Sequence, residues 1–289
     1  MTVTRTDALP FADWLALREA ADAVARSAEL LEPVRRRLAG NSAGRAGPAA
    51  GSAAPLVVHD LGSGTGSMGR WLAPRLPGPQ HWIMYDRDPE LLEQAAARMV
   101  SAAADGAPVT VETRRRDITR LTADDLRGAA LVTASALLDM LTAEEIERMV
   151  ATCAAAGRPT WLTLSVVGRV ELTPADPLDS EIADAFNAHQ RRRTADGRRL
   201  LGPDAADAAV AAFGRHGVEV RVRSSPWRLG PDQAALSAEW FAGWLDAARE
   251  QRPELTGRVT AYARRRRAEA AEGRLGVVVH HHDLLANCE

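Results

Sequence analysis

The chain has 289 residues, of which 46% are hydrophobic, so it can bury a sizeable core as one large domain or two small ones. Its 36 basic residues nearly balance 38 acidic ones, and the net charge of -2 excludes a global field that would attract nucleic acid or an anionic membrane. Apart from histidine, every basic residue is arginine, which excludes a Walker A loop, a kinase-type lysine and Schiff-base chemistry. No apolar run approaches the roughly 20 residues of a membrane span, and we expect a cytoplasmic protein.

Cysteine and histidine do not supply a metal site in this sequence. Cys153 and Cys288 are too few for a disulfide framework or a thiolate metal centre. In the histidine run near the carboxyl end, only His280 and His282 would share one face of a strand, and two imidazoles without a third ligand hold a metal weakly. We therefore predict no metal.

The amino-terminal part of the chain is predicted to be helical. Apolar residues recur at helical spacing between residues 10 and 38, and Pro33 is expected to break or restart the helix. Residues 39–55 consist largely of Gly, Ser, Ala and Pro, which is typical of a flexible linker. We therefore divide the chain into a helical lid at 1–38, a linker at 39–55 and a main domain at 56–289.

Apolar runs of strand length alternate with helical segments from residue 56 onward. This alternation predicts an α/β fold in which a mostly parallel, doubly wound sheet is covered on both faces. Ligands of such sheets bind beyond the carboxyl ends of the strands. Seven strands are expected, at residues 56–61, 81–86, 109–117, 130–137, 160–168, 218–225 and 275–283.

Two segments interrupt the alternation and are predicted to be insertions. Residues 170–203 are polar and rich in turn formers, and because they follow the fifth strand we expect them over the ligand end of the sheet. Residues 226–273 carry Trp240, Phe241 and Trp244 at helical spacing. These aromatic residues favour a buried core, with an aromatic acceptor pocket as the alternative.

The glycines after the first strand fit two motifs. Gly62, Gly64 and Gly66 spell G-x-G-x-G, whereas Gly64, Gly66 and Gly69 spell the dinucleotide pattern G-x-G-x-x-G. Asp60 ends the strand just before the loop, where a carboxylate suits a ligand's ammonium group and repels a pyrophosphate. The acid therefore favours S-adenosylmethionine (SAM), which carries an ammonium group, over a dinucleotide.

Acidic residues also end the second and third strands. Asp86, 22 residues beyond Gly64, can accept hydrogen bonds from both ribose hydroxyls of either cofactor. Asp117 can accept from an adenine amine, and Ile118 can cover the ring.

These motifs together resemble the class I SAM-dependent methyltransferases. Asp60 to Gly66 as D-x-G-x-G-x-G, Asp86 before "DPELL", Asp117-Ile118 and "LVTASALLDML" follow one another in that family's order, and the resemblance covers residues 56–170. It implies a seven-stranded sheet whose last strand is antiparallel, with an N-terminal helical lid and a helical insertion before that strand. It implies SAM as cofactor, bound by Asp60, Gly62, Ser63, Gly64, Gly66, Asp86, Arg87, Asp117, Ile118 and Ser135.

Three further residues are candidates for cofactor closure and catalysis. Arg18 in the leading helix is expected to close over the cofactor with Trp14 and to pair with its carboxylate; a packed helix with an exposed arginine is the alternative. His189 is the first candidate general base because an unperturbed histidine pKa near 6.5 suits that role at neutral pH. Asp139 is the second, facing the transferred methyl group or merely capping the next helix.

We expect a methyltransferase that acts on the oxygen or nitrogen of a small molecule. The resembling family's amino-methylating members often carry N-P-P-Y where this chain has "SALLDML", which argues against methylation of a nucleic-acid base or a protein amide. The alternatives are an NAD(P)-dependent oxidoreductase that uses Gly64, Gly66 and Gly69, an rRNA or protein methyltransferase, and a module that binds a cofactor or partner without catalysis. We expect no nucleic-acid or membrane partner, and a homodimer is left open.

Overall fold

The structure is a computed structural model that describes residues 9–43 and 54–287. Its strands are β1 (Leu56–Leu61), β2 (Gln80–Asp86), β3 (Val109–Arg115), β4 (Leu131–Ser135), β5 (Thr160–Thr173), β6 (Val220–Ser224), β7 (Trp227–Leu229) and β8 (Gly276–Ala286). Its α-helices are α1 (Phe11–Ala25), α2 (Leu31–Ala43), α3 (Ser67–Leu72), α4 (Pro89–Arg98), α5 (Ala143–Ala156), α6 (Asp179–Gln190), α7 (Ala205–Arg215), α8 (Ala234–Gln251) and α9 (Thr256–Ala271).

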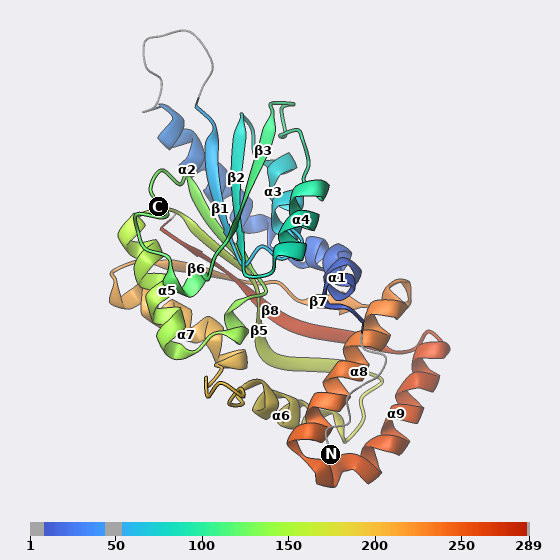
Figure 1. The fold of residues 1–289 in the computed structure, drawn as a ribbon. Helices are drawn as coiled ribbons and strands as arrows, with labels where there is room; N and C mark the ends of the chain where they lie inside the picture. The colour runs from blue at the N-terminus through green and yellow to red at the C-terminus, as the bar shows by residue number, and fades with distance from the viewer. Residues whose placement is uncertain (1–8, 44–53, 288–289) are drawn as a thin grey trace.

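The strands form one sheet in the order β3-β2-β1-β4-β5-β8-β6, with β7 pairing to β8 (Figure 1). Strands β1 to β5 are parallel, and β8 runs antiparallel to its neighbours β5, β6 and β7. The doubly wound α/β sheet with an antiparallel last strand is therefore confirmed. The seven expected strands are present, and β7 is an additional strand that the sequence analysis missed.

Both faces of the sheet are buried, as the continuous apolar strands predict. Along β2, Trp82 and Met84 enter the core under α2 and α3, whereas Ile83 and Tyr85 enter the core under α5 and α7. This division follows from the alternation of side chains along a strand. The sheet is thereby held rigid, and the carboxyl ends of β1, β2 and β4 meet at one edge.

Local sequence signals account for the ends of the best-defined helices. Asp88 caps α4 by accepting a hydrogen bond from the Glu90 backbone N–H at 2.9 Å, and Pro89 occupies the first helical position. In α5, Thr142 and Glu145 form a reciprocal capping box. Each of these helices begins just after a strand or turn at the carboxyl edge of the sheet.

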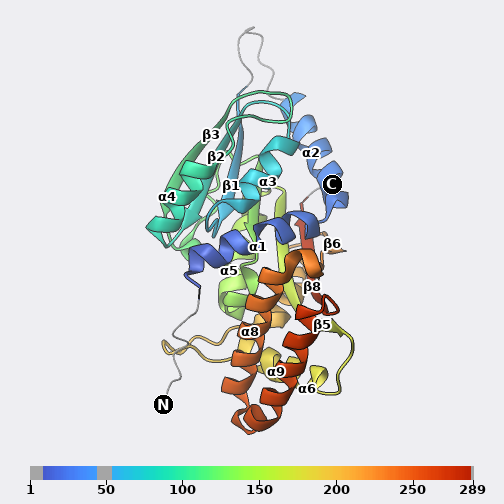
Figure 2. The ribbon, with the colours of Figure 1, turned by 90° about the vertical axis from the view of Figure 1, so that its right-hand side faces the viewer.

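A second lobe of helices extends beyond the carboxyl edge. Strands β5 and β8 continue past the rest of the sheet and remain paired from Val170 with Val279 to Thr173 with Gly276. Helices α6, α8 and α9 pack around this extension, where Trp244 and Tyr262 are fully buried (Figures 1 and 2). The interpretation of residues 170–203 as polar turns was wrong for the first residues, which prolong β5, and the segment also contains α6.

The amino-terminal helices have two different positions. Helix α1 lies between the sheet and the helical lobe (Figure 2), whereas α2 packs through Leu31, Val34 and Leu38 into the core beside β1. The break between them occurs before Leu31 and not at Pro33. Pro33 fits because the first turn of a helix needs no backbone N–H donor. Of the predicted linker, residues 44–53 lie outside the described residues.

Within the described ranges, none of the helices has the length and apolar character that crossing a membrane requires.

Candidate functional site

The turn after β1 exposes its backbone at the carboxyl edge of the sheet. Gly62 and Gly64 have φ values of 63° and 52°, a left-handed conformation that residues with a side chain rarely adopt. A Cβ atom on Gly62 would also lie 2.9 Å from Cδ1 of Leu137. Gly66, with φ 82°, immediately precedes α3. Glycine is therefore required here both by backbone conformation and by space.

Asp86 holds the turn at residues 62–66, which we call the glycine turn, against the end of β2. One carboxylate oxygen of Asp86 accepts a hydrogen bond from the Gly64 backbone N–H at 2.9 Å. The other accepts from the backbone N–H groups of Arg87 at 2.7 Å and Asp88 at 3.1 Å. The Ser63 N–H donates to the Tyr85 carbonyl at 2.8 Å. Asp86 is thus held beside the turn by backbone groups.

Gly69 has a different role from the other glycines. It lies inside α3, where a Cβ atom would come within 2.8 Å of the Met84 side chain and 3.1 Å of the Met99 side chain. Close packing of helix on strand is also what the third glycine of a dinucleotide fingerprint provides. The glycine spacing alone therefore does not separate the two classes of cofactor.

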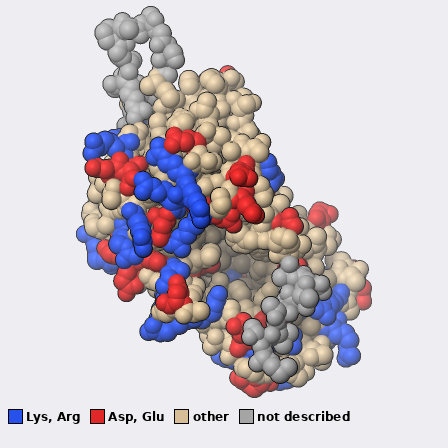
Figure 3. All heavy atoms as spheres, viewed as in Figure 1, with Lys and Arg blue, Asp and Glu red and all other residues tan. Residues whose placement is uncertain are grey.

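A cavity of about 380 Å³ opens above the glycine turn. Its volume falls in the range of about 300 to 1,000 Å³ that is typical of small-molecule sites. Helix α1 closes one side through Phe11, Trp14 and Leu15, and the segment after β4 closes another. The face of the molecule in Figure 3 is hollowed between the sheet and the helical lobe. We call this space the main cavity.

The structure brings most of the predicted site residues together around the main cavity. The predicted residues that line it are Arg18, Gly62, Ser63, Gly64, Asp86, Arg87, Ile118, Ser135 and Asp139. Four others do not line it, namely Asp60, Gly66, Asp117 and His189.

Asp60 lies beneath the cavity floor and is only 1% exposed. Its Oδ1 accepts a hydrogen bond from the Thr133 hydroxyl at 2.7 Å, whereas its Oδ2 has no hydrogen-bond partner among the described residues. Burial raises the pKa of Asp60 to about 7, although the Thr133 hydrogen bond and the nearby Arg26 oppose the shift. Asp60 is thus a buried carboxyl under the turn.

Arg26 is a buried cation that the sequence analysis did not single out. It follows α1, is 3% exposed, and donates hydrogen bonds to the hydroxyls of Ser67 at 3.1 Å and Ser135 at 3.2 Å. Its Nε and Nη1 have no partner within the described residues. Because Ser67 and Ser135 line the main cavity, Arg26 fixes two cavity hydroxyls from below. An arginine among many others offered no local signal for this role.

Asp117 is engaged by neighbouring side chains. Its Oδ1 accepts hydrogen bonds from the backbone N–H and hydroxyl of Thr119 at 3.0 and 2.7 Å and pairs with Arg87 at 2.7 Å. Although partial burial acts to raise it, these contacts lower the pKa of Asp117 to about 2. Asp117 therefore orients Arg87, while Arg87 and Ile118 present their own side chains to the cavity.

A second, smaller cavity of about 150 Å³ lies between α1, the β5–β8 extension and α6. We call it the side cavity. Trp14, Arg18, Ala136 and Asp139 line both cavities, so the two spaces adjoin at these residues. Trp240 lines the side cavity, whereas Phe241 and Trp244 are buried in the core of the helical lobe.

Arg18 and Asp139 stand at the junction of the cavities. Arg18 pairs with Asp22 at 3.0 Å, and its guanidinium lies 4.8 Å from the Trp227 ring centroid. Asp22 also accepts a hydrogen bond from the Trp227 indole N–H at 2.9 Å, which fixes the pair. Burial raises the pKa of Asp139, and Arg18 partly offsets this. The junction therefore holds a positioned cation beside a carboxyl of raised pKa.

His189 lies on another face of α6. Its Nε2 is 3.3 Å from a carboxylate oxygen of Glu250 on α8. Burial and Arg192 lower the pKa of His189. Phe186, Asn187 and Gln190, from the same helix, line the side cavity instead. The sequence pointed to the right segment without predicting its helix, and the residues of α6 that reach the cavities are neighbours of His189.

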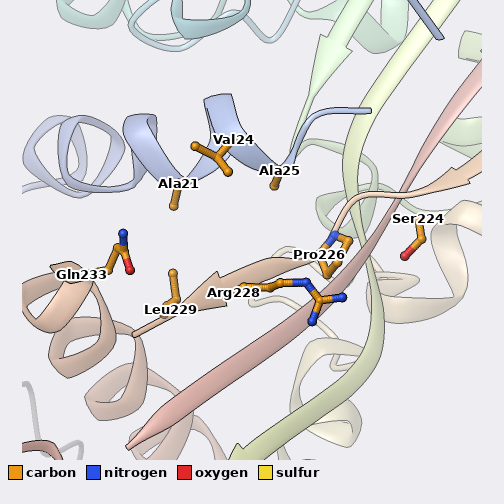
Figure 4. Close-up of a pocket in the computed structure, with 8 residues that line it drawn as sticks. All are labelled: Ala21, Val24, Ala25, Ser224, Pro226, Arg228, Leu229 and Gln233. Carbon is orange, nitrogen blue, oxygen red and sulfur yellow. The ribbon is translucent and has the colours of Figure 1, made fainter. Parts of the chain in front are cut away.

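A third cavity, of about 450 Å³, lies on the outer side of α1 (Figure 4). Ala21, Val24 and Ala25 of α1 face Leu229 and Arg228 of β7 across it. It contains no residue of the glycine turn and no acidic side chain. Among the described residues, no group of three His, Cys, Asp or Glu side chains could hold a metal ion.

Comparison with known families identifies the part of the chain that carries this site. A family model described as a methyltransferase domain matches residues 58–160. The match spans β1 to the start of β5 and includes the glycine turn, Asp86 and Asp139. Among curated proteins, no sequence matches this chain.

Several solved structures are similar to the chain at low identity. Magnesium protoporphyrin IX methyltransferase from Synechocystis is 16% identical, with 76% of this chain and 83% of that chain covered and a TM-score of 0.42. A SAM-dependent methyltransferase from Geobacter sulfurreducens is 17% identical, with coverages of 96% and 98% and a TM-score of 0.39. One from Thiobacillus denitrificans is 19% identical, with coverages of 96% and 99% and a TM-score of 0.40. All three were solved with S-adenosylhomocysteine (SAH) bound.

Proposed function

We propose that the protein transfers the methyl group of SAM to a small molecule, because residues 58–160 match a methyltransferase-domain family model and lie on a doubly wound sheet. The observation that carries the proposal is the adjoining pair of cavities, one above the glycine turn and one among aromatic side chains. We assign the main cavity to SAM and the side cavity to the methyl acceptor. Asp139 then stands between the two ligands.

The main cavity has the donors and acceptors that SAM requires. Asp86 places its carboxylate at the end of β2, where ribose hydroxyls can donate to it. Ile118 offers an apolar surface for the adenine ring. Ser63 has a buried hydroxyl without a partner among the described residues, which a polar ligand can satisfy. Arg18, already paired with Asp22, closes this cavity beside the acceptor and is the candidate partner of the SAM carboxylate.

When bound, the cofactor would supply a methyl group on a positively charged sulfur. In the transfer, a lone pair of the acceptor forms a bond to the methyl carbon, and the electron pair of the broken sulfur–carbon bond stays on sulfur. The protein's first task is to align the acceptor behind the methyl group, which supplies roughly 7 to 11 kcal/mol in well-oriented systems. The rigid carboxyl edge of the sheet and the enclosed side cavity serve this alignment. Its second task is to take the proton of a hydroxyl acceptor.

We assign that proton to the carboxylate of Asp139. It lines both cavities, whereas His189 faces Glu250. Its raised pKa makes it a stronger base than an ordinary carboxylate. The ionised form is the active one, so the rate is expected to rise with pH as Asp139 loses its proton.

A small acceptor fits better than a macromolecule. The side cavity of about 150 Å³ is bounded by α1, α6 and α8, so a group attached to a protein or RNA would need a long extension to enter it. Nucleic acid would also require a broad basic surface. The face in Figure 3 instead intersperses arginine with acidic residues.

The test compares Asp139→Asn with His189→Ala in a methyl-transfer assay that uses radiolabelled SAM. Asp139→Asn keeps the shape but removes the base, so we expect kcat to fall about 10²- to 10⁴-fold while the Kd for SAH stays within about twofold. Its remaining activity should no longer rise with pH. His189→Ala should change kcat less than about threefold. A large loss in His189→Ala with full activity in Asp139→Asn would contradict the assignment and restore His189 as the base.

A further inference from the structure

Four large aromatic side chains stand in the wall of the side cavity. Trp14, Phe186, Trp227 and Trp240 come from four different elements and line it together. The rings of Trp14 and Trp227 are 6.3 Å apart in an edge-to-face arrangement. A cavity of about 150 Å³ is the size that holds one benzene ring in an engineered protein. Shape and surface therefore suit a single flat ring.

Two residues that line the side cavity, Gln190 and His281, each have a buried polar atom without a partner. Oε1 of Gln190 makes no hydrogen bond within the described part of the chain, and neither does Nδ1 of His281. His281 is 2% exposed, and burial lowers its pKa to about 3, so its imidazole is neutral. A buried polar atom left unpaired is destabilising, so a ligand that donates to Gln190 would gain binding energy.

The charged side chains in the wall of the side cavity, apart from Asp139, already form ion pairs with neighbouring side chains. Arg18 pairs with Asp22 at 3.0 Å, and Arg169 pairs with Glu171 at 2.5 Å. Glu171 also lies 3.1 Å from Nε2 of His280. An acceptor with its own carboxylate would meet Asp139, while Arg18 is assigned to the SAM carboxylate and Arg169 is paired with Glu171. The cavity therefore favours an uncharged acceptor.

We propose that the acceptor is an uncharged single-ring phenol that carries a second hydrogen-bond donor on the ring. The proposal rests on the proposed function and specifies its substrate class. The phenolic oxygen to be methylated faces Asp139, which takes the phenolic proton as the oxygen bonds to the methyl carbon. The second donor satisfies Gln190 at the α6 side, and the aromatic side chains enclose the ring.

The test measures binding directly, by ligand-observed NMR titration of the protein saturated with SAH. The probes are catechol, resorcinol and hydroquinone, which place two hydroxyls on one ring at three spacings, together with 1,4-cyclohexanediol and benzoate. Stacking and polar contacts predict that at least one benzenediol binds about tenfold more tightly than the saturated diol and than benzoate.

Three variants locate the binding. Gln190→Leu keeps the volume but removes the acceptor, so the preferred benzenediol should bind about fivefold more weakly. Trp240→Ala should also weaken it. Arg228→Ala is the matched control and should leave the affinity unchanged, because Arg228 lines the cavity of Figure 4 and neither the main nor the side cavity.

The outcomes separate this proposal from the function on which it rests. If SAH binds but no benzenediol is preferred to the saturated diol, the acceptor class is wrong and the methyltransferase proposal stands. The acceptor class is also wrong if the preference for a benzenediol persists in Gln190→Leu and is lost in Arg228→Ala. The ring would then bind in the cavity on the outer side of α1. Failure of a separate SAH titration overturns the proposed function, and the acceptor class falls with it.

Discussion

Replacing Asp86 with alanine removes a carboxylate that serves both the glycine turn and the proposed ribose site. In the structure this carboxylate accepts backbone hydrogen bonds from Gly64 at 2.9 Å, Arg87 at 2.7 Å and Asp88 at 3.1 Å. A hydrogen bond to a charged partner contributes about 1.5 to 3 kcal/mol. Loss of the ribose contact alone therefore predicts SAH binding about 10- to 150-fold weaker.

The assay is calorimetric titration of SAH, accompanied by thermal unfolding of each variant. Asp88→Ala is the matched control, since Asp88 caps α4 through Glu90 and does not line the main cavity. It should cost about 1 kcal/mol of stability, typical of a lost helix cap, without weakening SAH. An unchanged SAH affinity in folded Asp86→Ala would refute the placement of the ribose at the end of β2.

Two further predictions concern stability. Asp60 has a folded pKa of about 7, above the unfolded value of about 3.9, so its ionisation destabilises the fold as pH rises. The free energy of unfolding of the wild type should therefore fall by about 4 kcal/mol between roughly pH 4 and pH 8, and that of Asp60→Asn should not show this fall. If urea unfolding gives the same pH dependence for both proteins, this prediction is wrong. Arg266, 1% exposed, donates to both Asp179 oxygens at 2.6 Å and to Glu269 at 2.8 Å. Arg266→Met should lower the free energy of unfolding by about 3 to 5 kcal/mol because it leaves these carboxylates buried without their partner. Arg267→Met, at an exposed position, should change it by less than about 0.5 kcal/mol. Equal effects of the two substitutions on Tm would disprove the buried network.

The sheet and the cofactor side of the site could be predicted because their signals are local. Apolar runs identified seven strands, and residues such as Gly62 and Asp86 lie within a few positions of a strand end. Parallel strands place those ends at one edge, so sequence order alone brings them together. The three-residue β7 and the extension of β5 were missed because their pairing with β8 is set by the helical lobe.

The acceptor side was less predictable, since it depends on how distant elements pack. The sequence pointed to residues 170–203 but not to α6, and His189 was chosen because a titratable side chain stands out in a sequence, whereas the face that a helix presents does not. Phe186, Asn187 and Gln190 share the cavity face by helical spacing. Arg26 was missed for a similar reason: its burial at the end of α1 results from tertiary packing around Ser67 and Ser135.

The most direct test of the central claim is calorimetric titration of the wild-type protein with SAH, SAM and NAD⁺. We predict that SAH and SAM bind at one site per chain and that NAD⁺ gives no saturable heat. Saturable binding of NAD⁺ with no response to SAH or SAM would contradict it, and would assign Gly64, Gly66 and Gly69 to a dinucleotide.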